Sequence, residues 1–483
     1  RIFSGRDGIV YADESENFEK CFERTGGKTL SMKENNFLGT EPIGKLLFKL
    51  AVPTVIAQLI NMFYNIVDRI YIGHIPGDGA LALTGVGVCL PLIMIISAFA
   101  ALVSSGGAPR ASIFMGKGEK ENAEKTLGNC FMAQIIASCI LTVVLLIWNR
   151  NFLMAFGASE NTIEYSVSYM NIYAMGTIFV QLTLGMNAFI TAQGFAKIGV
   201  LSVMIGAVTN IVLDPILIFG LRMGVQGAAL ATIISQAISC IWVLHFLFGE
   251  KTQLKIQKKY MKLERKILLP SIALGTATFI MQSSESVISV CFNSSLLKYG
   301  GDIAVGAMTI LTSVMQFAML PLQGLGQGAQ PIISYNYGAK NAERVKAAYK
   351  LLLKTSLGYV FVLWALVMLV PGAFSAMFTS DVELIAFTKT ALRIYLAVLF
   401  IFGIQMACQM TFTSLGNAKS SIVVAVMRKF VLLIPLIYIM PAVFKENQVM
   451  AVYLAEPVAD FLAVTFTAIL FSIQFKKALQ KIA

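Results

Sequence analysis

Residues 51–74 have the sequence AVPTVIAQLINMFYNIVDRIYIGH. The stretch is mostly apolar and is long enough for a helix that crosses a bilayer, which needs about 20 residues. Polar residues nevertheless recur along it at intervals of three and four: Gln58, Asn61, Asn65 and Asp68. This spacing places them on one face of a helix. The stretch therefore predicts a membrane-spanning helix that turns a polar face toward other parts of the protein.

The composition excludes most other classes of protein. Hydrophobic residues make up 57% of the 483 residues and charged residues only 13%, whereas soluble domains carry about 25% charged residues. The seven cysteines form no CxxC motif and no disulfide framework. The net charge of +12 is better explained by loops that face anionic lipid than by nucleic-acid binding. We therefore expect an all-α polytopic membrane protein in contact with lipids, with no nucleic-acid partner.

Apolar stretches separated by short polar breaks predict twelve transmembrane helices. We expect them at residues 43–73, 80–112, 123–148, 161–193, 198–220, 224–248, 266–296, 303–335, 343–370, 382–414, 418–444 and 447–475. The two halves of the chain resemble each other, because KLAVPTVI around Pro53 matches KILLPSIA around Pro270, 217 residues later. In the same way QGFAKIG at 193–199 matches LGNAKSS at 415–421, 222 residues later. Near-constant offsets indicate a duplicated six-helix unit, hence two pseudo-symmetric lobes related by an axis along the membrane normal.

The predicted domain organisation follows from these spans. It comprises a polar N-terminal tail at 1–40, a first lobe at 41–248, a basic cytoplasmic linker at 249–265, a second lobe at 266–475 and a cytoplasmic tail at 476–483. Residues 1–31 precede Met32, which opens a run like a natural start. We expect residues 1–31 to be a flexible tail or a segment that is not native to the protein.

The distribution of basic residues predicts the orientation. Lys and Arg number 24 in the loops and tails on one side of the predicted spans and four on the other side: Arg150, Arg222, Lys298 and Lys445. Basic loops stay in the cytoplasm. We therefore expect a multi-pass protein of the inner (cytoplasmic) membrane with both termini in the cytoplasm.

Five of the 26 acidic residues lie deep in predicted spans: Asp68, Asp214, Glu285, Glu456 and Asp460. A charged residue at the bilayer centre costs at least ~2.5 kcal/mol on insertion scales, so such residues usually pair with a cation or line an ion path. Glu456 and Asp460 are four residues apart, and we expect them to face Arg428 and Lys429 as a structural ion-pair cluster.

Two of these acids define a candidate cation site in the first lobe. Asn210 and Asp214 are one helical turn apart and share a face, and Pro215 removes a backbone donor beside them. At 1.5 Å per residue, Asp68, Asp214 and Thr232 are predicted at one depth, roughly 8–12 Å below the outer boundary. Together these side chains would form an oxygen-rich site for a proton or Na⁺. No other metal site is expected.

The polar stripe of residues 51–74 recurs in the seventh predicted helix. Thr278, Gln282 and Glu285 follow Asn61, Asn65 and Asp68 at an offset of 217 residues. Two interpretations remain open for this stripe. Glu285, Gln282, Asn61 and Asn65 form a second-lobe site or line a substrate cavity, or the amides make only interhelical hydrogen bonds.

The chain also resembles a known family, the multidrug and toxic compound extrusion (MATE) transporters, over roughly residues 40–475. The resemblance rests on the 51–74 stretch, on TAQGFAKIG at 191–199, on TNIVLDPILIFGLRMGVQGAALATIISQ at 209–236 and on PLQGLGQGAQPIISYNYGAKN at 321–341. The pattern is closer to the bacterial DinF-like and MepA-like branch than to the NorM-like branch. The resemblance implies two six-helix lobes around a central cleft and the exchange of a drug for H⁺ or Na⁺.

The resemblance also implies roles for particular residues. The first-lobe cation site of DinF-like members matches Asp68, Asn210, Asp214 and Thr232. NorM-like members use second-lobe acids that include a glutamate of the seventh helix, where Glu285 lies, although the surrounding QSSES differs from their pattern.

Three classes of function were compared. The favoured one is a secondary antiporter, expected as a monomer without cofactors, that exports organic cations or drugs in exchange for H⁺ or Na⁺. The alternative is a lipid or lipid-linked oligosaccharide flippase, which we would expect to carry more cationic residues in its cleft. A membrane enzyme is disfavoured, because the two histidines are isolated and the acids are dispersed.

Overall fold

The computed structural model of the chain describes residues 37–77, 79–379 and 381–482. The predicted tail at residues 1–31 lies outside the described residues. The described residues are mostly helical and include no strand. The predicted all-α fold class is therefore confirmed.

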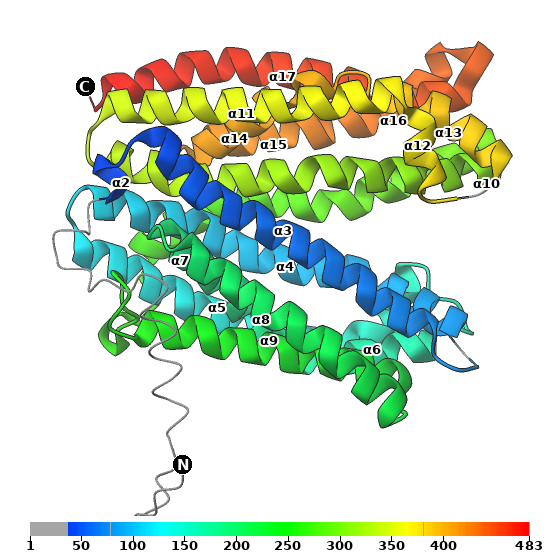
Figure 1. Cartoon of the computed structure of the whole chain (residues 1–483), viewed down its shortest axis with the longest axis horizontal. Coiled ribbons are helices and arrows are strands. Elements are labelled where there is room, and N and C mark those ends of the chain that lie inside the picture. The colour runs from blue at the N-terminus through cyan, green and yellow to red at the C-terminus, as the bar shows by residue number, and fades with distance from the viewer. Residues whose placement is uncertain (1–36, 78, 380, 483) are drawn as a thin grey trace, which may run out of the picture.

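The described part of the first lobe contains six candidate spans, counting one bent pair as a single span, and Figure 1 shows how they are arranged. A short helix, α2, precedes the spans, and α6 and α7 form one span bent by 57° at Gly176. The helices are α2 (Phe37–Thr40), α3 (Ile43–Gly73), α4 (Gly79–Gly116), α5 (Lys120–Ala155), α6 (Ile163–Met175), α7 (Thr177–Ala192), α8 (Ala196–Pro215) with the π-helix η2 (Ile216–Gly220), and α9 (Gly224–Phe248).

The second lobe repeats this plan. The pair α13 and α14 is bent by 50°, as α6 and α7 are. A short 3₁₀ helix, η3 (Lys258–Tyr260), lies between the lobes. The helices are α10 (Arg265–Gly338), α11 (Ala342–Leu369), α12 (Pro371–Ala376), α13 (Val382–Tyr395), α14 (Leu399–Ser414), α15 (Ala418–Val426) with the π-helix η4 (Met427–Leu433), α16 (Ile434–Val443), η5 (Lys445–Asn447) and α17 (Gln448–Gln480).

The 74 residues of α10 form two antiparallel spans. A straight helix of this length would be about 110 Å long. Near its start, however, the Ser271 carbonyl lies against Gly106 of α4, and near its end the Tyr335 carbonyl lies against Gly116 of the same helix. The chain reverses at Gly301, whose φ of 63° is readily adopted only by glycine. With α10 counted as two spans and each bent pair as one, the described residues contain the twelve predicted spans.

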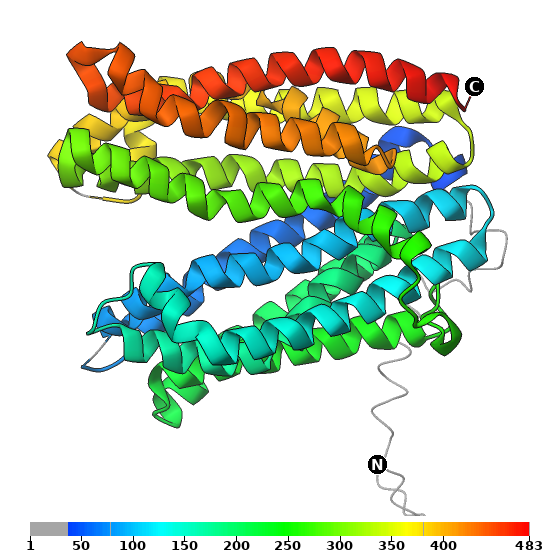
Figure 2. The same cartoon turned by 180° about the vertical axis from the view of Figure 1, so that it is seen from behind.

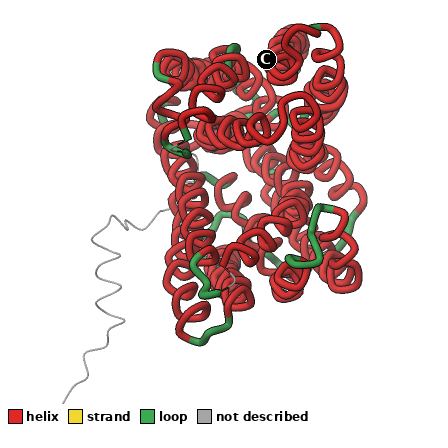
Figure 3. The backbone as a smooth tube through the Cα atoms, turned by 90° about the vertical axis from the view of Figure 1, so that its right-hand side faces the viewer, coloured by secondary structure: helices red, strands yellow, loops and turns green. Residues whose placement is uncertain are grey.

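Both described ends of the chain lie at the same end of the molecule, at the left of Figure 1, which we call the terminal end. Figure 2 shows the same arrangement from behind. Figure 3 shows the molecule from the opposite end, which we call the far end, with the helices nearly end-on and short loops between them. This arrangement agrees with an even number of spans in each lobe.

The two lobes are joined through α3 and α4 on one side and α10 on the other. The Thr54 hydroxyl donates to the Gly324 carbonyl at 2.6 Å, and the Gln58 amide donates to Gln327 Oε1 at 3.3 Å. Both contacts lie between the middle of α3 and the terminal end. Beyond Gln58, α3 makes no hydrogen bond to the second lobe within the described part of the chain. The lobes thus separate toward the far end, as Figures 1 and 2 show.

We predict that the closed terminal end depends on backbone contact at Gly275. A Cβ atom there would lie 1.8 Å from the Leu102 carbonyl oxygen of α4, and overpacking of this kind costs about 1–3 kcal/mol. Gly275→Val should therefore lower the thermal unfolding midpoint of the purified protein by several degrees. Gly358→Val is the matched control, because nothing lies within 4 Å of a Cβ at Gly358. Equal midpoints for the two variants would contradict the packing described.

Candidate functional site

The structure brings together the two acids of the first lobe. Asp68 lies near the far end of α3, and Asp214 is the penultimate residue of α8. Their carboxyl groups lie near enough for each to act electrostatically on the other. The Asn210 amide donates to Asp214 Oδ1 at 3.2 Å, and both residues of this pair are buried. Arg69, next to Asp68 in sequence, is exposed and makes no ion pair with either acid among the described residues.

The end of α8 has a local distortion that follows from its sequence. Pro215 has no N–H to donate and disturbs the regular hydrogen bonding of the helix. The backbone then widens into the π-helix η2, where the Leu221 N–H donates to the Ile216 carbonyl at 2.8 Å. Single π-turns of this kind occur frequently at functional sites. The distortion begins immediately after Asp214.

A third helix contributes a tyrosine that the sequence analysis did not identify. Tyr169 of α6 is buried and lies near Thr232, and Asp68 is among its nearest charged neighbours. Its ring stacks on Tyr173 with centroids 6.1 Å apart. In the sequence, the one pattern that could have pointed to Tyr169 is its pairing with Tyr173 one helical turn later. Thr232 itself donates to the Ala228 carbonyl at 3.0 Å, so its hydroxyl oxygen can still accept a hydrogen bond or contact a cation.

A cavity of about 40 Å³ lies beside the acid pair, among α3, α7, α8 and α9. Asn61, Tyr64, Asn210 and Thr232 are among the residues that line it. A space of this size holds a water molecule or a small ion, since one water needs about 10–15 Å³. Asn61, placed in the sequence analysis with Glu285, thus belongs to the first-lobe cavity.

Several buried oxygens in and around this cavity have no hydrogen-bond partner within the described part of the chain: Asp68 Oδ1, Asn187 Oδ1, Asn210 Oδ1, Asp214 Oδ2 and Gln236 Oε1. An unsatisfied buried polar atom costs about 1–3 kcal/mol. A proton on one carboxyl or a bound hard cation would satisfy several of them at once, because such cations prefer oxygen ligands. The residues present therefore fit either H⁺ or Na⁺.

The acids of the second lobe have basic partners. Arg428 of η4 donates to Asp460 at 2.7 Å and to Glu456 at 3.1 Å, as the sequence predicted. Lys429 was expected to face the same two acids, but its ion-pair partner is Glu285 of α10, at 2.7 Å. The reason is geometric, because adjacent helical residues point about 100° apart.

The remaining polar residues of the stripes do not form one site. Gln282 and Glu285 are exposed on α10, and Asn65 is exposed on α3, where its amide donates to the Asn61 carbonyl at 2.6 Å. The structure thus separates the proposed second-lobe set, since Asn61 faces the first-lobe cavity and Glu285 faces Lys429.

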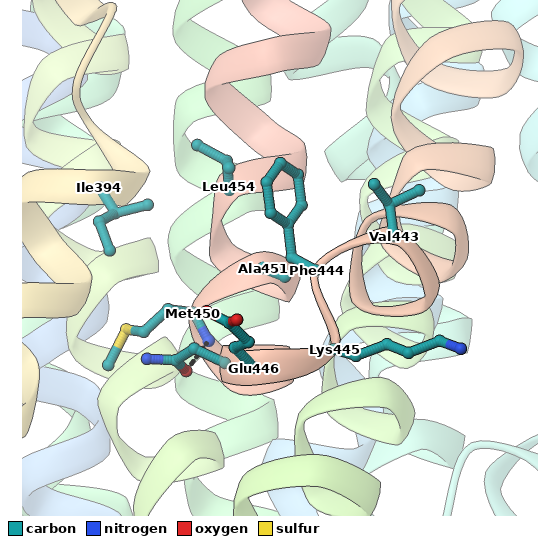
Figure 4. Close-up of a pocket in the computed structure, with 9 residues that line it drawn as sticks. Ile394, Val443, Phe444, Lys445, Glu446, Met450, Ala451 and Leu454 are labelled. Atoms are coloured by element: carbon teal, nitrogen blue, oxygen red, sulfur yellow. Dashed lines mark hydrogen bonds between the residues drawn. The ribbon is translucent and has the colours of Figure 1, made fainter.

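A much larger cavity, of about 720 Å³, opens at the far end of the second lobe (Figure 4). Its wall is mainly apolar, with Ile394 of α13 and Leu454 of α17 on the inside and Lys445 and Glu446 in the loop between α16 and α17. No sequence pattern predicted this cavity, because it is formed where three separate helix ends meet.

The fold and the site together define a polytopic membrane transporter with an ion-sized, oxygen-lined cavity in one lobe. A family model described as MatE matches residues 53–216 and 276–439, and the two matches have equal length and begin 223 residues apart. These matches cover more than half of the chain, which therefore belongs to the MatE family. Proteins of this family are transporters and not enzymes.

Similar proteins agree with this assignment. The multidrug export protein MepA of Staphylococcus haemolyticus is 26% identical over 423 residues, which cover 87% of this chain and 92% of MepA. A crystal structure of MATE in the bent conformation has a TM-score of 0.87 at 22% identity and covers 94% of this chain and 99% of that one. A MOP superfamily transporter from Pyrococcus furiosus, described with a binding pocket of reverse polarity that suggests a different function, has a TM-score of 0.85, 22% identity and coverage of 93% and 99%. These two structural similarities concern the fold alone.

We predict different consequences for loss of the two basic residues of η4. The side chains of Arg428, Glu456 and Asp460 are 7%, 5% and 6% exposed, whereas Glu285 beside Lys429 is 54% exposed. Removing one partner of a buried ion pair costs about 3–5 kcal/mol. Arg428→Met should therefore lower the thermal unfolding midpoint more than Lys429→Met, because the carboxylate that Lys429→Met leaves unpaired is already half-exposed. Equal or reversed midpoints would show that Arg428 does not hold the second lobe together.

Proposed function

We propose that the chain is a secondary antiporter that exports organic cations or drugs in exchange for H⁺ or Na⁺ bound at Asp68, Asn210, Asp214 and Thr232. The observation that carries this proposal is the proximity of Asp68 and Asp214, beside buried oxygens without partners among the described residues. The description of MepA as a multidrug export protein supports the class of substrate. No cofactor is needed beyond the coupling ion.

The position of α3 supports a mechanism for coupling. Asp68 faces α8 of the first lobe, and about 21 Å away on the same helix Thr54 bonds the second lobe. Pro53 lies next to that contact and removes a backbone donor there. A cation on Asp68 and Asp214 would hold α3 against α8, and its loss would free α3 to shift against α10. An ion can drive the switch between two conformations only if it binds one of them better.

The orientation and location belong to the same proposal. The 24 to four distribution of Lys and Arg supports placing the terminal end, where the lobes are joined, in the cytoplasm. The far end, where the helices of the two lobes diverge, would then face outward, in the direction of export. We propose a location in the cytoplasmic membrane, a monomeric state and contact with lipids on the exposed apolar helix faces.

The coupling role of the acid pair predicts the behaviour of two variants. Asp68→Asn and Asp214→Asn each keep the shape and some hydrogen bonding but remove the titratable charge, so each should abolish gradient-driven efflux while the protein still inserts. Dye efflux from reconstituted vesicles, with pH and Na⁺ gradients imposed separately, measures this and identifies the ion. Glu164→Gln, at an exposed ion pair with Arg150, is the control and should transport normally. Wild-type efflux from both aspartate variants would rule out the first-lobe site.

The proposed orientation predicts the accessibility of single cysteines. In a variant without the native cysteines, Arg150→Cys and Lys298→Cys should react with an impermeant maleimide added to intact cells. Lys258→Cys and Lys340→Cys should react only after the membrane is opened, because their loops carry the basic residues that stay inside. Reversed labelling would contradict the orientation, and mixed labelling within one set would contradict the twelve spans.

A further inference from the structure

A short segment in front of the first span connects the two lobes at the terminal end. This segment, residues 37–41, consists of α2 and Glu41, and it precedes α3 in the chain (Figure 1). Leu38 within it is only 1% exposed. It belongs to a buried apolar cluster that also includes Ala196 of α8 in the first lobe and Ile332 of α10 in the second. The segment therefore occupies the junction between the lobes.

Hydrogen bonds fix the segment to the second lobe. Arg344 of α11 donates through Nη2 to the Leu38 carbonyl at 3.1 Å and to the Glu41 carbonyl at 2.7 Å. Asn336 of α10, which is buried, donates to the Leu38 carbonyl at 2.9 Å and accepts from Arg344 Nε at 3.0 Å. Hydrogen bonds from a charged donor are stronger than those between neutral groups. Arg344 and Asn336 thus form an anchor for the backbone of the segment.

The contact of the segment with the first lobe is of a different kind. The Phe37 ring lies against Gly194, in the turn between α7 and α8, so closely that a Cβ at Gly194 would overlap with it. Gly194 has a φ of 89°, which favours glycine for a second reason. The Lys49 ammonium group lies over the same ring, 4.7 Å from its centre. Because the contact between Phe37 and the turn is apolar, it can separate without leaving a buried polar group unpaired.

The linker in front of the second lobe makes a comparable connection in the opposite direction. It is held by two buried side chains of α5: Glu124 accepts from Gln257 Nε2 at 2.6 Å, and Asn129 accepts from the Glu264 N–H at 2.6 Å. Helices α5 and α11 are each the third span of their lobe. The repeat therefore places the leading segment of each lobe on the other lobe, both times at the terminal end.

We propose that residues 37–41 are a latch that keeps the terminal end closed, and that Phe37 must leave Gly194 before the lobes can separate there. Arg344 and Asn336 are positioning residues, because they hold the latch on the second lobe where Phe37 reaches the turn between α7 and α8. The direction of opening rests on the proposed function: with the terminal end in the cytoplasm, release of the latch admits substrate from inside.

Double electron–electron resonance between spin labels on the two lobes tests the latch in the full-length protein without its native cysteines. Labels at Lys197→Cys and Lys419→Cys report the gap, because both residues are exposed and are the second residues of α8 and α15. Phe37→Ala should raise the share of molecules with the longer distance about five-fold, as expected for loss of part of one aromatic contact. Arg344→Met, which removes the anchor, should shift the distances in the same direction.

Two control variants separate the latch from a general loss of structure. Phe37→Leu keeps an apolar side chain against the turn and should restore most of the short distance. Lys346→Met removes an exposed positive charge from the same helix as Arg344 and should leave the distances unchanged. If Arg344→Met fails to fold, Phe37→Ala makes the same test at a side chain that is already partly exposed.

Unchanged distances in Phe37→Ala would overturn the latch, and so would an equal shift in Lys346→Met. The distances are measured without transport, so this result is independent of the proposed antiport. A shift in Phe37→Ala, in a protein whose efflux follows neither a pH nor a Na⁺ gradient, would support the latch and contradict the antiporter.

Discussion

A carboxylate inside a membrane must be offset by a proton, a cation or a basic side chain, and the two lobes meet this requirement in different ways. In the second lobe, Arg428 and Lys429 supply permanent positive charge to Glu456, Asp460 and Glu285. In the first lobe, Asp68 and Asp214 lie close together, and neither forms an ion pair with a basic side chain among the described residues. This difference is the reason for proposing that a mobile ion binds the first-lobe pair and not the second-lobe acids.

The same constraint explains why α3 both carries one of the first-lobe acids and contacts the second lobe. Toward the terminal end, its residues Thr54 and Gln58 bond the second lobe, and toward the far end, Asn61 and Asp68 face other helices of the first lobe. A regular helix transmits displacement along its length, since its backbone bonds are internal. We therefore propose that occupancy of the acid pair and the contact between the lobes are linked through α3.

Much of the fold could be predicted from the sequence, because hydropathy, helical period and the repeat depend only on local order. The twelve spans, the bent fourth and tenth spans as single units, and the acids themselves follow from such patterns. Which helix a polar face meets depends on packing between distant segments. For this reason Tyr169, the pairing of Lys429 with Glu285 and the far-end cavity were not anticipated. The helical period separates the directions of Arg428 and Lys429 by about 100°. It does not determine which acid each side chain pairs with.

The most direct test of competition between the coupling ion and an organic cation is the affinity of the purified protein for ethidium. Fluorescence anisotropy measures this affinity over a range of pH and Na⁺ concentration. Binding at two linked sites is reciprocal, so an ion that drives export must weaken ethidium binding in the state it stabilises. We expect the apparent Kd to rise with one of the two ions and this dependence to vanish in Asp68→Asn. A wild-type Kd that is independent of both ions, or the same dependence in Asp68→Asn, would contradict coupling through the first-lobe acid pair.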